Sequence, residues 1–158
     1  MILIKIENLT KKFGSQIILN NLNLNIQDGQ KVLIMGQNGA GKSTLMKAIL
    51  GELICDSGSI FIDNINPIID RKNALRYLSF VPQTPPPLRL SVAQLCEYSI
   101  SSTQTDLNNI INYLKELDLN YETESKKPFY FLLGGMKQKV LIALALARDS
   151  KTILFDEP

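Results

Sequence analysis

The first part of the chain changes from an alternating to a continuous hydrophobic pattern. Over positions 21–26, three asparagines alternate with three apolar residues. This period of two predicts a strand with one buried and one solvent-facing side, as in an antiparallel sheet. Asp28 and Gly29 then form a turn, and residues 31–35 are apolar at their last four positions. A continuous apolar run of this kind predicts a strand of a parallel sheet that is buried on both faces.

The elements that follow are short and separated by glycine or proline. A glycine-rich loop at 36–41 precedes a helical pattern over 43–50, which Gly51 ends. Three further apolar runs, each bounded by turn residues, predict strands at 59–62, 78–81 and 152–155. The chain therefore alternates strands and helices, as α/β proteins do.

The middle of the chain has a helical period. Residues 85–87 are three consecutive prolines, which predict a stiff, extended connector. Beyond them, Leu and Ile recur at helical spacing behind Thr105 and Asp106, which are suitable helix caps, so we expect a small helical insert over residues 91 to 127. A later helix over 137–148 is apolar on nearly all sides, which predicts that it is buried.

Composition narrows the class of protein. The 158 residues have the length of one ordinary domain, and the net charge of +2, from 17 basic and 15 acidic residues, gives no reason to expect nucleic acid as a partner. Cys55 and Cys96 have no metal-ligand spacing and the chain has no histidine, so we predict two buried thiols in a reducing compartment. The N-terminal residues lack the basic and apolar pattern of a secretory leader, so we expect no export. The longest apolar run, at 140–147, falls short of the roughly 20 residues that span a bilayer. Any membrane role is expected to depend on a partner.

One motif carries chemistry on its own. Residues 36–43 fit the pattern G-x-x-x-x-G-K-[ST], through Gly36, Gln37, Asn38, Gly39, Ala40, Gly41, Lys42 and Ser43. The glycines let the backbone wrap closely around phosphate oxygens, so that several N–H groups and a helix N-terminus point at them. The lysine adds a positive charge and the serine hydroxyl is a ligand for Mg²⁺. This motif predicts nucleotide binding.

Other segments, in their order and spacing, resemble the nucleotide-binding domain of the ATP-binding-cassette (ABC) transporters over essentially the whole chain. Phe80-Val81-Pro82-Gln83 resembles the Q-loop, and residues 132–136, followed by Lys137-Gln138-Lys139, resemble the signature segment. Residues 153–158 resemble the Walker B strand and its following glutamate. The aromatic residue Phe13 falls where that family stacks a ring on adenine. The alternative for Phe13 is an ordinary core residue.

The resemblance assigns roles to these residues. It implies that Thr44 joins residues 36–43 in binding ATP, and that Gln83 and Asp156 join Ser43 around Mg²⁺. Glu157 would orient and deprotonate the attacking water, with Lys42 and Gln83 as further catalytic groups. The implied protein is an ATPase that pairs with a second nucleotide-binding domain and drives transmembrane permease subunits, from the cytoplasmic face of the membrane.

The sequence departs from the family pattern at two places. The signature has Leu133 and Met136 where the family has serine and usually glutamine, while Gly134 and Gly135 are kept. Leucine cannot supply the serine hydroxyl, whose hydrogen bond to a charged phosphate is worth about 1.5–3 kcal/mol. The family pattern also continues beyond Walker B with a switch histidine that these 158 residues do not contain. We therefore expect a shortened cassette with a weakened contact across the dimer.

These observations predict a phosphate-loop ATPase fold with an N-terminal antiparallel β subdomain and a helical insert, incomplete at its C-terminus. The core would comprise 1–83 and 137–158, and the helical subdomain about 91–136. The main hypothesis is an ABC transporter subunit that binds and hydrolyses MgATP. The alternatives are a chain that binds nucleotide without hydrolysing it and, third, an ABC protein acting on ribosomes or DNA.

Overall fold

The computed structural model describes residues 1–156, except for the side chain of Ile2. The chain divides into two compact units, Met1–Leu78 and Ser79–Pro158. Each unit has its own sheet and helices, and each is described by itself.

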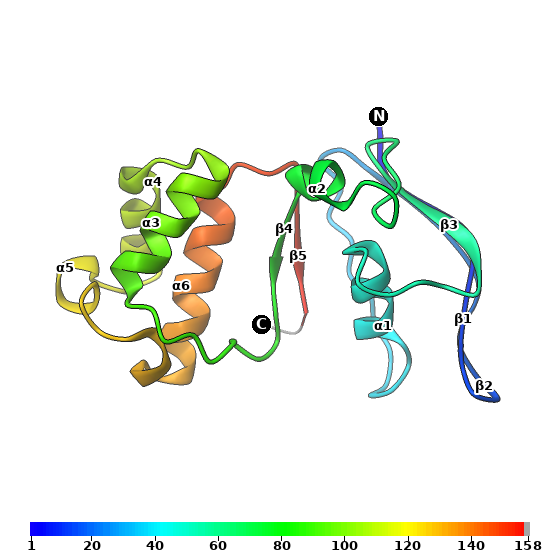
Figure 1. Cartoon of the computed structure of the whole chain (residues 1–158), viewed down its shortest axis with the longest axis horizontal. Helices are drawn as coiled ribbons and strands as arrows, with labels where there is room; N and C mark the ends of the chain where they lie inside the picture. Colours follow the sequence, from blue (N-terminus) through cyan, green and yellow to red (C-terminus); the bar gives the residue numbers. More distant parts are fainter. Residues whose placement is uncertain (157–158) are drawn as a thin grey trace. The chain divides into compact units, whose positions relative to one another are not determined.

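The first unit is built on a three-stranded antiparallel sheet (Figure 1). Its strands are β1 (Ile2–Phe13), β2 (Gln16–Gln27) and β3 (Ser57–Ile62), in the order β2-β1-β3. The asparagines at 21, 23 and 25 are exposed, whereas Ile26 is buried and Leu22 and Leu24 are half-buried. The prediction of an antiparallel strand with one wet face is therefore confirmed.

Helix α1 (Lys42–Ile49) supplies the rest of the core of this unit. Its buried residues are Leu45, Ala48 and Ile49, and the helix contacts both β2 and β3. Gly51 follows the helix with a φ of 67°, as expected of a residue that ends a helix. Two short helices, α2 (Arg71–Ala74) and η1 (Leu75–Tyr77), complete the unit.

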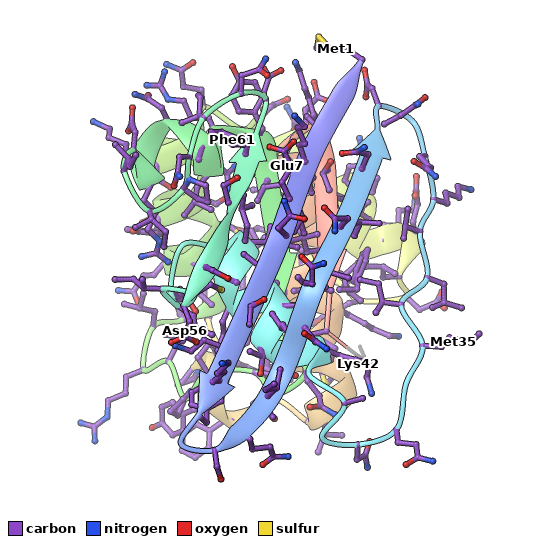
Figure 2. The ribbon with its side chains drawn as sticks, turned by 90° about the vertical axis from the view of Figure 1, so that its right-hand side faces the viewer. Met1, Glu7, Met35, Lys42, Asp56 and Phe61 are labelled. Atoms are coloured by element: carbon purple, nitrogen blue, oxygen red, sulfur yellow. The ribbon has the colours of Figure 1, made fainter. Side chains whose placement is uncertain are left out.

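The predicted buried strand at residues 31–35 is wrong. The segment has no regular secondary structure, and Leu33 and Met35 are 81% and 83% exposed. Figure 2 shows Met35 on the loop that follows β2, with its side chain pointing away from the sheet. A strand needs a neighbour for its backbone N–H and C=O groups, and within residues 1–156 no strand pairs with this segment. An apolar pattern shows that side chains could be buried, but it does not show whether a neighbouring strand is present to pair with.

The second unit combines a pair of strands with a group of helices. Strands β4 (Leu78–Val81) and β5 (Thr152–Phe155) are hydrogen-bonded neighbours and have the predicted bounds. The helices are α3 (Val92–Thr103), α4 (Leu107–Glu116), α5 (Tyr121–Glu124), η2 (Phe129–Phe131) and α6 (Gly134–Ala147), and α3, α4 and α6 lie side by side (Figure 1). The prediction of helices in the region 91–127 is confirmed.

The helical core follows from the apolar spacing and from the caps. Ile110 and Leu114 of α4 pack with Phe129 and with Val140 of α6 in one buried cluster. Asp106 accepts a hydrogen bond from the Asn108 backbone N–H at 3.3 Å and so caps α4, as predicted. Helix α6 begins at Gly134 rather than at 137, and only part of it is fully buried.

The prediction of two buried thiols has a mixed outcome. Cys96 is fully buried in the helical cluster, but Cys55 is only half-buried, so the expectation of two buried thiols holds for one of them. Both thiols are free. Among residues 1–156, no helix is long and apolar enough to cross a membrane.

Candidate functional site

The phosphate loop leads directly into the N-terminus of α1. Within it, the Ala40 N–H donates to the Gln37 carbonyl at 3.0 Å, which closes a turn. Gly39 and Gly41 have φ values of 84° and 94°, in the left-handed region that favours glycine. Gly41 is the residue before the first helical one, and its carbonyl accepts the Leu45 N–H at 2.9 Å. The fixed glycine before Lys42 therefore has a conformational reason.

Gly41 also needs glycine for lack of space. A Cβ atom at this position would lie 2.9 Å from Cγ2 of Ile18 and 3.1 Å from its carbonyl oxygen. Carbon atoms in contact normally lie about 3.5–4.0 Å apart, so a side chain would displace the loop or β2. The close approach of the loop to β2 therefore favours glycine at position 41.

The electrostatics of the loop suit a polyanion. The Lys42 ammonium donates to the carbonyl oxygens of Gly36 at 2.8 Å and Gln37 at 3.3 Å, which holds it over the loop. Figure 2 places Lys42 at the start of α1, behind the sheet. The N-cap residue of α1 is Gly41, which has no side chain to cap the helix, and the first turn of α1 contains no acidic residue. The N-terminus of a helix carries the positive end of its dipole. Residues 36–44 therefore fit the phosphate groups of a nucleotide.

Phe13 lies at the end of β1 and is 52% exposed. The Lys11 ammonium lies 5.3 Å from the centroid of its ring, within the range of a cation–π contact. The interpretation of Phe13 as a core residue is therefore wrong. An exposed ring next to a cation is compatible with adenine stacking, which stays a prediction.

The second unit holds Gln83 and Asp156, two of the residues predicted to bind the metal. Gln83 and Asp156 follow the neighbouring strands β4 and β5, and the Asp156 backbone N–H donates to the Val81 carbonyl at 3.1 Å. These two strand ends therefore lie together. The amide oxygen of Gln83 and the carboxylate oxygens of Asp156 are hard ligands of the kind that Mg²⁺ takes. Glu157 lies outside the described residues.

The signature segment forms the start of α6. Leu133 is its N-cap residue, 74% exposed, and its side chain makes no capping hydrogen bond. Gly134 and Gly135 are the first helical residues and have open space where a Cβ would lie. Met136 packs against the helical core. The segment thus forms the first turn of α6, but the side chain of Leu133 has no oxygen atom that could accept a hydrogen bond from the N–H groups of that turn.

Gln138 follows the signature segment, and no role of its own was predicted for it from the sequence. Its side-chain nitrogen donates to the carbonyl oxygens of Pro82 at 3.1 Å and Gln83 at 3.4 Å. The only signal in the sequence is an amide between two lysines, just before an apolar helical run. Nothing in that pattern indicates a partner 55 residues away.

The structure therefore collects the predicted site residues in two sets. Residues 36–44 and Phe13 belong to the first unit, while Gln83, Asp156 and the signature segment belong to the second. A glycine-rich loop that wraps to a helix N-terminus and carries a lysine defines the class of phosphate-loop nucleotide-binding proteins.

Comparison with known proteins identifies the family within this class. The family model described as ABC transporter matches residues 19–158, and the chain belongs to that family. A zinc import ATP-binding protein ZnuC of Pseudomonas fluorescens (strain Pf0-1) is 35% identical over 159 residues, covering 99% of this chain and 55% of the relative. An energy-coupling factor transporter ATP-binding protein EcfA of onion yellows phytoplasma is 37% identical, with coverage of 98% and 59%.

Solved structures agree on the fold. The CbiO1 protein of Clostridium perfringens, described as part of the ABC transporter complex CbiONQ, is 30% identical with a TM-score of 0.74, covering 99% of this chain and 66% of its own. An ATP-binding subunit of an ABC transporter has a TM-score of 0.87 at 24% identity, covering 98% of this chain and 65% of its own. The chain spans about 55–66% of the length of these relatives. Its fold is that of an ABC ATPase domain with an antiparallel β subdomain.

Proposed function

We propose that this chain binds MgATP through residues 36–44 and belongs to an ATP-hydrolysing subunit that drives an ABC transporter. The observation that carries the proposal is the position of the Lys42 ammonium over the loop, beside the N-terminus of α1, whose N-cap residue is Gly41. Backbone N–H groups, the helix dipole and the ammonium then all favour a bound polyphosphate.

The remaining roles follow from the chemistry of each group. Ser43, Gln83 and Asp156 would hold Mg²⁺, which neutralises charge on the phosphates when it is bound. Lys42 would bind the outer phosphate oxygens, and Glu157 would accept the proton of the attacking water. The exposed ring of Phe13 would stack on adenine.

The partners are part of the same proposal. Relatives named as transport ATP-binding proteins support a membrane permease as partner and a second nucleotide-binding domain as the dimer mate. Such a subunit would lie on the cytoplasmic face of the membrane. Relatives named for zinc import and for lantibiotic transport are identical to this chain at 35% and 32% of positions, respectively. Sequence similarity therefore favours no single transported substrate.

One observation favours a second candidate, a chain that binds ATP but does not hydrolyse it. Leu133 is exposed at the start of α6 and offers no hydroxyl for a phosphate oxygen across a dimer. Losing a hydrogen bond to a charged group of about 1.5–3 kcal/mol corresponds to a loss of roughly 10- to 150-fold in binding across that interface.

The test measures binding and turnover separately. A fluorescent ATP analogue with Mg²⁺ is titrated into the chain, into Lys42→Ala and into Lys47→Ala, a matched control on the last turn of α1. We expect Lys42→Ala alone to weaken binding by about tenfold or more, because a charge-assisted contact is lost. Equal affinity of the two variants would refute the proposal. Phosphate release that depends on Lys42 supports hydrolysis, whereas binding without release supports the second candidate.

A further inference from the structure

Gln138 connects α6 to the segment that contains Gln83. Its side chain leaves the first turns of α6 and reaches the backbone immediately after β4, where it donates to the carbonyl oxygens of Pro82 at 3.1 Å and Gln83 at 3.4 Å. All three residues lie in the second unit, Ser79–Pro158. Two carbonyls in succession are therefore held by one amide group.

The direction of this amide is fixed by its partners. A carbonyl oxygen only accepts hydrogen bonds, so the nitrogen of Gln138 must face Pro82 and Gln83. The opposite end of the amide, Oε1, is buried and has no hydrogen-bond partner among residues 1–156. The polar contacts of the side chain are thus directed entirely to the Gln83 segment.

The backbone of the segment that Gln138 contacts is rich in proline and so has few N–H donors of its own. Pro82 has no N–H group, so its carbonyl is its only polar backbone group. Gln83 is exposed, and the prolines at 85–87 offer no N–H donors to a neighbouring strand. The two bonds from Gln138 therefore act at the point where the chain leaves β4 and turns toward α3.

Gln138 also lies on the same helical face of α6 as Gly134, the first residue of the helix. Residues four apart share a helical face, which places Gln138 one turn beyond Gly134. A change in the position of the Leu133–Met136 segment would move the Gln138 amide with it, because both belong to one continuous helix.

We infer that Gln138 is a positioning residue for Gln83. It sets the direction of the Gln83 backbone, and hence of the side chain, and it ties this direction to the start of α6. The inference rests on the proposed function, because it matters only if Gln83 acts on Mg²⁺ or on the attacking water. It needs no contact between Gln138 and nucleotide.

The test is a double-mutant cycle on the gain in affinity that Mg²⁺ gives to ATP binding. The affinity of a fluorescent ATP analogue is measured with Mg²⁺ and with EDTA in the full chain. The variants are Gln83→Ala, Gln138→Met, the two combined, and Gln138→Lys, which restores a donor. Asn112→Met, on the exposed side of α4, is the matched control.

We expect Gln83→Ala and Gln138→Met each to reduce the Mg²⁺-dependent gain about threefold or more, and the double variant to lose no more than the larger single one. Gln138→Lys should recover the gain, and Asn112→Met should keep it. Urea unfolding midpoints are recorded for every variant, so that a general loss of stability is recognised. If Gln138→Met does not fold, Gln138→Glu replaces it, because a carboxylate has a similar shape and no donor.

Two failures are distinguishable. If the parent chain binds MgATP no better than Lys42→Ala, the proposed function itself is wrong. If Lys42-dependent binding is present but the effects of Gln83→Ala and Gln138→Met add, or Gln138→Met keeps the full gain, or Gln83→Ala does, then the positioning role is refuted.

Discussion

The substitution Gly41→Ala tests whether the geometry of the phosphate loop determines its binding. Gly41 has a φ of 94°, and an added Cβ would lie 2.9 Å from Cγ2 of Ile18. Left-handed backbone costs a residue with a Cβ about 1–2 kcal/mol. Overpacking of this kind adds about 1–3 kcal/mol. We therefore expect a loss of about 2–5 kcal/mol, against a typical total stability of about 5–15 kcal/mol.

The same substitution should weaken nucleotide binding. We expect the loop to move in order to relieve the contact with Ile18. Nucleotide binding would then have to return the loop to its original conformation, which costs free energy. A restoring cost of about 1.4 kcal/mol already reduces affinity tenfold. We expect a loss of at least about tenfold, measured by titration with a fluorescent ATP analogue in the presence of Mg²⁺.

Gly29→Ala is the matched control for this experiment. Gly29 has a φ of 75° but nothing within 4 Å of an added Cβ, so it keeps the backbone strain and removes the steric contact. It should cost only about 1–2 kcal/mol in urea unfolding followed by circular dichroism, and leave nucleotide affinity unchanged. If Gly41→Ala were no less stable than Gly29→Ala and bound nucleotide equally well, the steric reasoning would be refuted.

Three further predictions concern caps and titratable groups. Leu133→Ser should stabilise the chain by about 0.5–2 kcal/mol in urea unfolding, because serine caps α6 where leucine cannot, whereas Leu133→Ala should give no gain. Burial raises the pKa of both thiols, that of Cys96 to about 11, and Cys96 is fully buried whereas Cys55 is half-buried. A thiol reagent at about pH 8 should therefore modify Cys55 first, and equal rates in the folded chain would contradict this. The Lys12 backbone N–H, at 2.7 Å, is the main cause that lowers the pKa of Asp56, so its stabilising effect is present above about pH 4 and is lost as the pH falls through the lowered pKa. Asp56→Asn should therefore flatten the decrease of the unfolding midpoint below that pH, and an unchanged decrease would count against the assignment.

Local patterns were sufficient for most secondary structure. The strands at 78–81 and 152–155 and the cap at Asp106 were predicted correctly, because alternation, apolar runs and capping depend on residues close together in the sequence. The phosphate loop was found for the same reason. Its glycines, lysine and serine act within one turn and the helix that follows it.

Residues 31–35 show where local patterns fail. Their apolar run predicts a strand buried on both faces, yet in the structure Leu33 and Met35 face outward on a loop. Burial of a strand is a property of its neighbours, and a hydrophobic pattern does not say whether they are present. At Phe13 the sequence left two alternatives open, a ring that stacks on adenine and an ordinary core residue. The structure decides against the core residue, because the ring is exposed.

The sequence by itself determined the class of protein, since residues 36–43 carry the phosphate-binding chemistry within one short segment. Only the tertiary structure decided that Gly41 lies against Ile18 and that the amide of Gln138 holds the carbonyls of Pro82 and Gln83. The physical reason is distance along the chain. Contacts between residues 23 or 55 positions apart depend on how strands and helices pack, and no local period encodes them.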